Sequence, residues 1–234
     1  MIFLVLFIVL VGRSKMVYVS LLPTIFYILL KKRKKYLLVF LVLCAVGYPL
    51  LPTSVTKRVP YIIKYNEDPS SKLRVIFWGA GIEELKEKPI YGWKALDRKE
   101  ATLKYYKKHG TLEYVKTWFL NEKFYKLTTQ HYIATHNSYL QYLLDYGILG
   151  FAFFILVLVQ NMVMLFKVKF YKNKKDSKYI AFEIATKASL IAWLIQGMTD
   201  NNLNNKHMII TLTILFVFIC YLYKCCEKKR KIIK

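Results

Sequence analysis

Long apolar stretches, separated by short basic loops, constrain the fold of this chain more than any other feature of its sequence. A transmembrane helix needs about 20 apolar residues, and shorter stretches also serve when flanking lysines snorkel to the interface or the bilayer thins locally. Five stretches meet one of these conditions: Val17–Leu30, Tyr36–Leu51, Gly147–Phe166, Tyr179–Met198 and Met208–Tyr223. The sequence therefore predicts an all-α fold, a polytopic transmembrane helical bundle.

The charge of the chain is strongly positive, with 37 Lys and Arg residues against 14 Asp and Glu residues. Such an excess is also typical of nucleic-acid-binding proteins. Here, however, the basic residues lie between apolar stretches, and 56% of all residues are hydrophobic. We therefore expect no nucleic-acid partner and interpret the basic segments as loops beside a membrane, with a lysine-rich coding bias as the alternative explanation for part of the excess.

The basic loops also orient the helices, because short loops rich in Lys and Arg remain in the cytoplasm. The segments Lys31–Lys35, Lys167–Lys178 and Lys224–Lys234 fit this rule. Alternation then places Pro52–Tyr146 on the opposite face. The predicted organisation is transmembrane helices in 1–51, a large outer loop in 52–146, and transmembrane helices with a basic cytoplasmic tail in 147–234.

The outer loop is expected to be helical. Ser70 and Ser71 are candidate caps for a helix that runs to Lys88 and stops at Pro89, with Leu73, Phe77, Ala80 and Leu85 on its apolar face. A second helix is predicted over Leu112–Leu127, and a third begins near His136.

Five residues of the predicted outer face are candidate site residues. Arg74 and Trp78 are four residues apart and share a helix face, His136 and Asn137 precede a helix start, and Arg13 lies in a short loop. A guanidinium binds pyrophosphate oxygens in bidentate fashion, and a neutral imidazole takes a proton from a hydroxyl group. Each residue also has a structural interpretation: a solvated or anchoring charge for the arginines, and a helix cap for His136 and Asn137.

Four short motifs follow one another in this part of the chain. They are Arg74 with Trp78, Pro89 with Gly92, His136 and Asn137 with Leu140, and Gly147 with Gly150. This order resembles the O-antigen ligase and polymerase superfamily of bacterial envelope proteins, whose members share an Arg-x-x-x-Trp helix, a Pro-x-x-Gly turn and a His-Asn-x-x-Leu helix that runs into Gly-x-x-Gly. The stretch Gly12–Ser14, which contains Arg13, is similar to the Ser-Arg stretch that opens the family's shared region.

The resemblance implies a membrane glycosyltransferase of lipopolysaccharide biosynthesis, active at the periplasmic face of the bacterial inner membrane. The donor would be a glycan on undecaprenyl pyrophosphate, and the acceptor a lipid A-core sugar or another glycan unit. We expect His136 and Arg74 to be catalytic and Arg13, Trp78 and Asn137 to bind substrate. No metal and no cofactor is expected, and the outer loop contains no compact Asp/His cluster for a divalent ion.

Three alternatives to a ligase stay open at this point. A polysaccharide polymerase needs the same donor site. A non-catalytic remnant or subunit is also consistent with the sequence, because family members have more spans and Met1–Val11 reads as the end of a longer helix. A second polypeptide would then supply the missing N-terminal helices. A transporter would need charges inside a span, where Glu183 and Lys187 lie four residues apart and are able to pair with each other.

Overall fold

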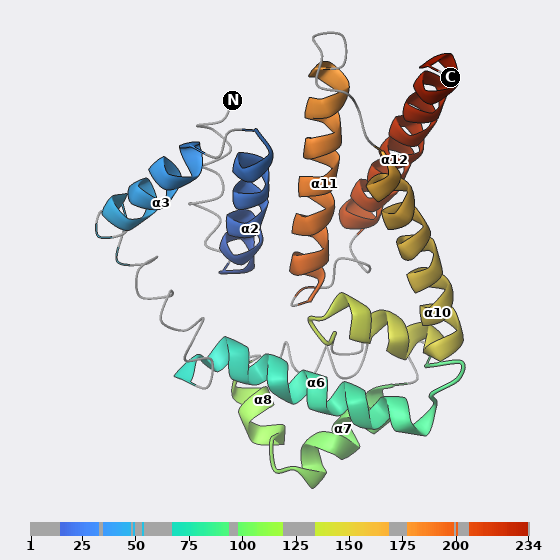
Figure 1. The fold of residues 1–234 in the computed structure, drawn as a ribbon. Helices are drawn as coiled ribbons and strands as arrows, with labels where there is room; N and C mark the ends of the chain where they lie inside the picture. Colours follow the sequence, from blue (N-terminus) through green and yellow to red (C-terminus); the bar gives the residue numbers. More distant parts are fainter. Residues whose placement is uncertain are drawn as a thin grey trace. The chain divides into compact units, whose positions relative to one another are not determined.

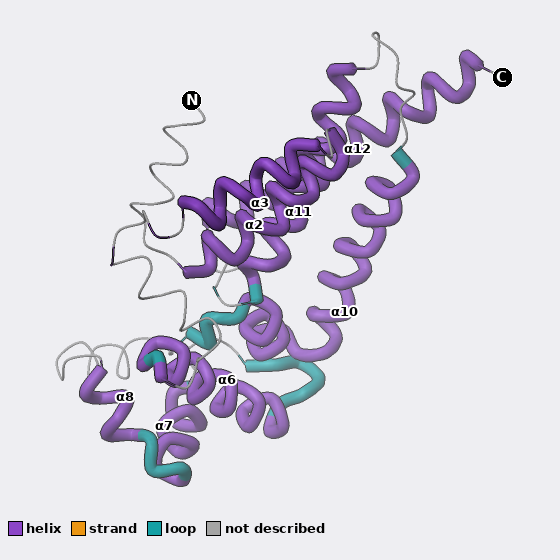
Figure 2. Tube along the Cα trace, turned by 60° about the vertical axis from the view of Figure 1, so that its left-hand side comes forward, coloured by secondary structure: helices purple, strands orange, loops and turns teal. Residues whose placement is uncertain are grey.

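The structure is a computed structural model that describes residues 15–32, 35–47, 49, 53, 67–93, 98–118, 134–168, 177–198, 200 and 206–233. Within these ranges the chain is helical and contains no strand (Figures 1 and 2). The predicted all-α fold is therefore confirmed. The chain divides into two compact units. The first comprises Met1–Tyr65, Val159–Gln196 and Ile209–Lys234, and the second comprises Asn66–Leu158 and Gly197–Met208.

Among the described residues, three helices are long and apolar enough to cross a membrane. They are α10 (Ser138–Lys167), α11 (Ser177–Gly197) and the Met208–Lys228 part of α12 (Lys206–Ile233). Two shorter apolar helices, α2 (Lys15–Lys32) and α3 (Lys35–Gly47), occur where the sequence also predicts spans. The chain is thus an all-α membrane protein, and length and composition alone support a crossing for three of the five predicted spans.

The first unit is held together by apolar seams between its helices. On α12 the buried residues follow one another at intervals of three and four, the spacing of a coiled-coil contact line: Leu212, Leu215, Ile219, Leu222 and Cys226. Val168 packs against Leu222 and Cys226. On α11, Lys187 pairs with Glu183 one turn away, as their spacing predicts.

The second unit begins with α6 (Pro69–Glu87), whose first turn differs from the prediction. The helix cap is Asp68, not Ser70 or Ser71: its carboxylate accepts hydrogen bonds from the backbone N–H of Ser71, at 2.8 Å, and from the hydroxyl group of the same residue. Pro69 occupies the first helical position, where a missing N–H group costs nothing. The predicted end of the helix before Pro89 is confirmed.

The buried face of α6 is apolar for three turns and then becomes charged. Leu73, Phe77 and Ala80 are buried as predicted, but the next buried side chain is Glu84 and not Leu85, which is only half-buried. The apolar part forms a core with Tyr106 of α7 (Lys99–Lys108) and Val115 of α8 (Leu112–Trp118). The sequence did not predict α7. The rest of the predicted helix over Leu112–Leu127 lies outside the described residues.

Helix α10 is kinked at Gly147, whose φ of 67° belongs to the left-handed region that favours glycine. The turn that follows α6 packs against this kink so tightly that a Cβ atom on Gly147 would lie 2.1 Å from the carbonyl oxygen of Ile90. Gly92, with a φ of 72°, meets the kink from the other side, and a Cβ there would lie 2.4 Å from the nitrogen of Gly147. The Pro-x-x-Gly and Gly-x-x-Gly motifs therefore dock on each other.

Candidate functional site

The start of α10 presents the candidate base. Asn137 caps the helix, because its side-chain oxygen accepts hydrogen bonds from the backbone N–H groups of Tyr139 and Leu140, both at 3.0 Å. His136, one residue earlier, has a φ of 52°, the one positive value among the described non-glycine residues. Such a backbone persists only where its surroundings hold it in place.

The ring of His136 lies against the core of the second unit. It stacks on Phe77 of α6, with ring centroids 6.0 Å apart and an interplanar angle of 20°. Burial lowers the pKa of His136, and the positive charge of Arg74 lowers it further, against a smaller opposite effect of Asp200. A lowered pKa keeps the imidazole neutral at pH 7, which is the form that accepts a proton.

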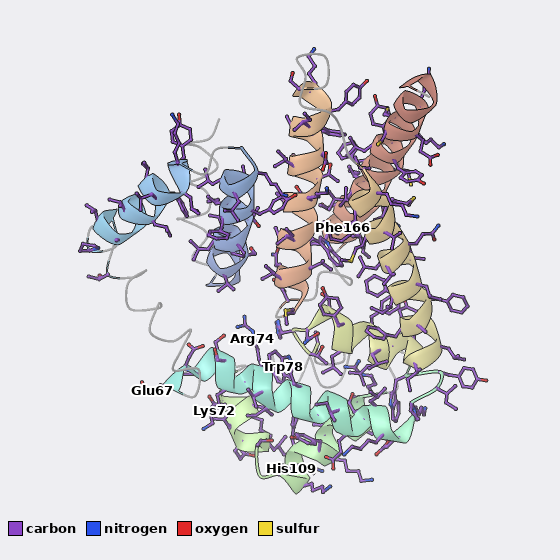
Figure 3. All side chains as sticks on the ribbon, viewed as in Figure 1. Glu67, Lys72, Arg74, Trp78, His109 and Phe166 are labelled. Carbon is purple, nitrogen blue, oxygen red and sulfur yellow. The ribbon has the colours of Figure 1, made fainter. Side chains whose placement is uncertain are left out.

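Arg74 and Trp78 come from the same side of α6. Figure 3 shows Arg74 on the side of the helix that faces away from α7 and α8, whereas Lys72 lies toward α8, over the ring of Tyr114. The indole nitrogen of Trp78 is buried and has no hydrogen-bond partner among the described residues. Arg74, Trp78 and His136 all belong to the second unit.

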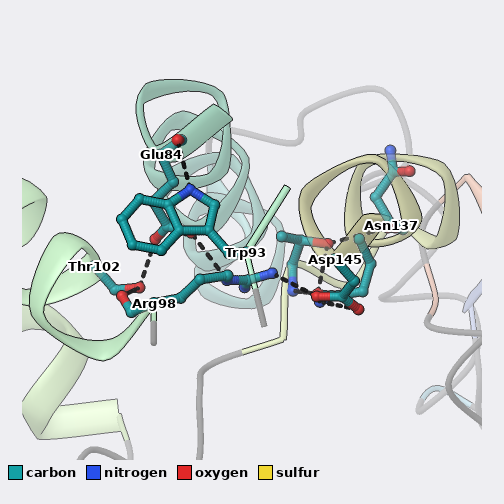
Figure 4. Close-up of polar contacts among 8 residues, drawn as sticks. Glu84, Trp93, Arg98, Thr102, Asn137 and Asp145 are labelled. Carbon is teal, nitrogen blue, oxygen red and sulfur yellow. Dashed lines mark hydrogen bonds and ion pairs between the residues drawn. The ribbon is translucent and has the colours of Figure 1, made fainter. Parts of the chain in front are cut away.

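A buried network of charges, which the sequence analysis missed, lies beside the site (Figure 4). The guanidinium of Arg98 pairs with Glu84 at 3.0 Å and with Asp145 of α10 at 3.2 Å. The hydroxyl group of Thr102 donates to Glu84 as well. Burial nevertheless raises the pKa of Glu84, because it outweighs the lowering effects of Arg98 and Thr102. The network ties α6, the start of α7 and α10 together.

The same network reaches the residue before His136. The side-chain amide of Gln141 donates to Asp145 at 2.9 Å, and its oxygen accepts a hydrogen bond from the backbone N–H of Thr135 at 3.0 Å. The hydroxyl group of Thr135 in turn donates to the carbonyl oxygen of Asn137 at 3.0 Å. Both neighbours of His136 are therefore fixed, which accounts for its left-handed backbone.

A pocket of about 240 Å³ opens between α6 and α7, but it does not coincide with this site. Its lining includes Glu83, Lys86, Glu87, Lys104 and Lys108, and none of the predicted site residues. Lys108 is paired with Glu83 across it. His136 and Arg74, which are near enough for the charge of Arg74 to act on the imidazole, both lie outside the lining of this pocket.

Asp200, which is not one of the five candidate site residues, is held near the start of α10, since the hydroxyl group of Ser138 donates to its carbonyl oxygen at 2.6 Å. Arg13 lies outside the described residues, so its predicted role stays a prediction. No group of three or more His, Cys, Asp or Glu side chains suited to a metal ion occurs in the described part of the chain.

The comparison with protein families decides which family the chain resembles. The profile described as O-antigen ligase matches residues 1–155, about two thirds of the sequence. The chain belongs to the O-antigen ligase family. The matched region of this O-antigen ligase family member contains every motif residue from Arg13 to Gly150. No curated protein and no solved structure matches the chain.

Proposed function

We propose that this member of the O-antigen ligase family transfers a glycan from undecaprenyl pyrophosphate to a lipid A-core acceptor at the periplasmic face of the inner membrane. The observation that carries the proposal is a half-buried His136 that lies close enough to Arg74 for the positive charge of the guanidinium to lower the pKa of the imidazole. One group is suited to accept a proton from an attacking hydroxyl, and the other to receive the charge of a departing pyrophosphate.

The proposed reaction uses the neutral imidazole of His136 and the guanidinium cation of Arg74. The acceptor hydroxyl oxygen attacks the anomeric carbon of the donor and loses its proton to the imidazole of His136. A new C–O bond forms as the bond from the anomeric carbon to the pyrophosphate oxygen breaks, and that oxygen keeps the electron pair. Arg74 stabilises the resulting negative charge, and Arg13 is proposed to do the same. A positioned general base contributes about 10²–10⁴-fold in rate, and one charge-stabilising donor about 3–4 kcal/mol.

The surroundings of the two residues support this division of roles. Phe77 stacks on one face of the imidazole, so a substrate would approach the other face or the ring edge. The indole N–H of Trp78, on the same side of α6 as Arg74, is a buried donor in need of an acceptor. An oxygen of the donor's pyrophosphate or of its first sugar would satisfy it.

The experiment that tests the function supplies the full-length protein in proteoliposomes with a lipid-linked glycan and lipid A-core, and detects the product by mass spectrometry. We expect glycosylated lipid A-core from the wild type and almost none from Arg74→Ala. Lys104→Ala, an exposed change on α7, serves as the matched control and should leave transfer unchanged. Elongated lipid-linked glycan in place of the ligated acceptor would identify a polymerase instead, and no transfer from the wild type would refute both.

A further inference from the structure

The turn between α6 and Trp93 carries two exposed apolar side chains at the point where the apolar part of α10 begins. Ile90 is 54% exposed and Tyr91 is 79% exposed. We propose that the turn Pro89–Tyr91 inserts its side chains into the lipid interface and docks the second unit on the membrane surface. This surface is independent of the proposed glycan chemistry, since neither residue takes part in it.

Hydrogen bonds fix the turn to the first residues of the span. The backbone N–H of Ile148 donates to the carbonyl oxygen of Pro89 at 2.8 Å, and that of Leu149 donates to Ile90 at 3.4 Å. The helix starts anew after the kink at Gly147, so these N–H groups lack the acceptor within the helix that later N–H groups have. Near lipid, where water is scarce, such donors need a protein acceptor. The carbonyl oxygens of Pro89 and Ile90 are these acceptors, so the turn lies at the same depth in the membrane as Ile148.

The length of the span sets that depth. From Ile148 to Lys167, where the basic loop begins, α10 has about 20 residues, and at 1.5 Å per residue it covers about 30 Å, the thickness of the hydrocarbon core. Lys167 marks one boundary, so Ile148 lies at the other. Ile90, whose carbonyl oxygen accepts a hydrogen bond from the start of the span, and its neighbour Tyr91 therefore lie at the boundary between hydrocarbon and headgroups.

The surrounding side chains fit a lipid environment better than water. Tyr146, Ile148 and Leu149 are exposed around the kink and continue the apolar surface of the turn onto the span. Tyr91 is of the residue type that concentrates at headgroup level. On the other side of the turn, Lys88 lies 4.0 Å from the ring centroid of Trp93, so an ammonium group stands next to the proposed insertion point, where lipid phosphates are found.

In both views α6 runs crosswise to residues 148–158 of α10, which belong to the same unit (Figures 1 and 2). Because these residues begin the span, we place α6 along the membrane surface. The geometry thus provides an anchor that holds α6, and Arg74 on it, at constant depth.

The test measures the depth of spin labels in the full-length protein, reconstituted in nanodiscs of phosphatidylethanolamine and phosphatidylglycerol. Single cysteines are introduced as Ile90→Cys and Tyr91→Cys in a background without Cys44, Cys220, Cys225 and Cys226. Phe153→Cys, exposed on the span, gives the lipid reference, and Lys104→Cys on α7 gives the aqueous reference. Collisions with oxygen, which concentrates in lipid, are compared with collisions with a water-soluble nickel complex.

We expect the oxygen-to-nickel collision ratio at positions 90 and 91 to rise well above that at position 104 and to approach that at position 153. A ratio equal to that of position 104 would overturn the proposal, because the turn would then lie in water. Low collision rates with both reagents would overturn it as well, since they would mean that a protein surface covers the turn. Two labelled positions are used so that the result does not depend on one substitution.

Discussion

The imidazole of His136 stacks on the phenyl ring of Phe77, with ring centroids 6.0 Å apart and planes inclined by 20°. Phe77 is only 2% exposed and belongs to the core formed by α6, α7 and α8. Phe77 is therefore part of the apolar core of the second unit and also contacts the candidate base. The burial that lowers the pKa of His136 comes in part from the packing of this core.

Removal of the Phe77 ring should raise the pKa of His136. Phe77→Leu keeps an apolar side chain in the core but uncovers one face of the imidazole, so its charged form is better solvated and its pKa moves toward the ordinary value. The measurement is an NMR titration of His136. Val115→Ala is the control, since it disturbs the same core from α8 and should leave the titration unchanged. An unchanged pKa in Phe77→Leu would show that the stacking does not bury the ring.

Two charge changes should shift the pKa of His136 in opposite directions. Arg74→Gln removes a positive charge that lowers this pKa, so the pKa rises; Asp200→Asn removes a negative charge that raises it, so the pKa falls. The neutral base is lost as the pH drops through the pKa. The NMR titration of His136 should therefore move to higher pH in Arg74→Gln and to lower pH in Asp200→Asn. Shifts in the same direction would contradict the electrostatic account.

Replacement of Arg98 by methionine should destabilise the second unit strongly. The change leaves Glu84 and Asp145 without their cation in a buried environment, and the loss of one partner of a buried pair typically costs about 3–5 kcal/mol. The midpoint of thermal unfolding in detergent measures it. Lys108→Met removes the exposed pair with Glu83 and should hardly move the midpoint. Equal effects of the two changes would mean that the buried network does not hold the unit together.

Gly147→Ala should loosen the contact between the α6 turn and α10. Gly147 and Gly110 both have positive φ angles, of 67° and 64°, so alanine is strained at either position, and the ψ of −174° at Gly147 belongs to a region that is essentially restricted to glycine. Only at Gly147 does the new Cβ also collide with Ile90; at Gly110 nothing lies within 4 Å. Hydrogen exchange of the Ile148 and Leu149 amides should accelerate in Gly147→Ala and not in Gly110→Ala. Similar exchange in both variants would argue against the docking of the two glycine motifs.

Much of the fold was predictable because helices and spans depend on local patterns. The period of Leu73, Phe77 and Ala80 placed the core face of α6, and apolar length placed the spans. Four residues after Ala80, the same helix face contains Glu84. A carboxylate on a buried face needs a cation beside it, so this position could have predicted a basic partner. The sequence did not reveal that this partner is Arg98, because the pairing joins residues far apart in the chain.

The candidate site residues could be proposed from the sequence, whereas the contacts that hold them could not. Arg74, Trp78, His136 and Asn137 were chosen from their motifs, and the structure brings them into one unit. The left-handed backbone of His136 and its stacking on Phe77 depend on Gln141 and Asp145 holding the neighbouring residues. These supporting contacts produce no periodic pattern in the sequence, because each of them depends on tertiary packing alone.

The most direct measurement of the central claim is the single-turnover rate of glycan transfer by His136→Asn with both substrates saturating. Asparagine tolerates the left-handed backbone that His136 adopts, so the substitution removes the base and keeps the local fold. The account predicts that the rate falls by about 10²–10⁴-fold while binding of the lipid-linked donor persists. A rate equal to that of the wild type would contradict the assignment of His136 as the base that activates the acceptor.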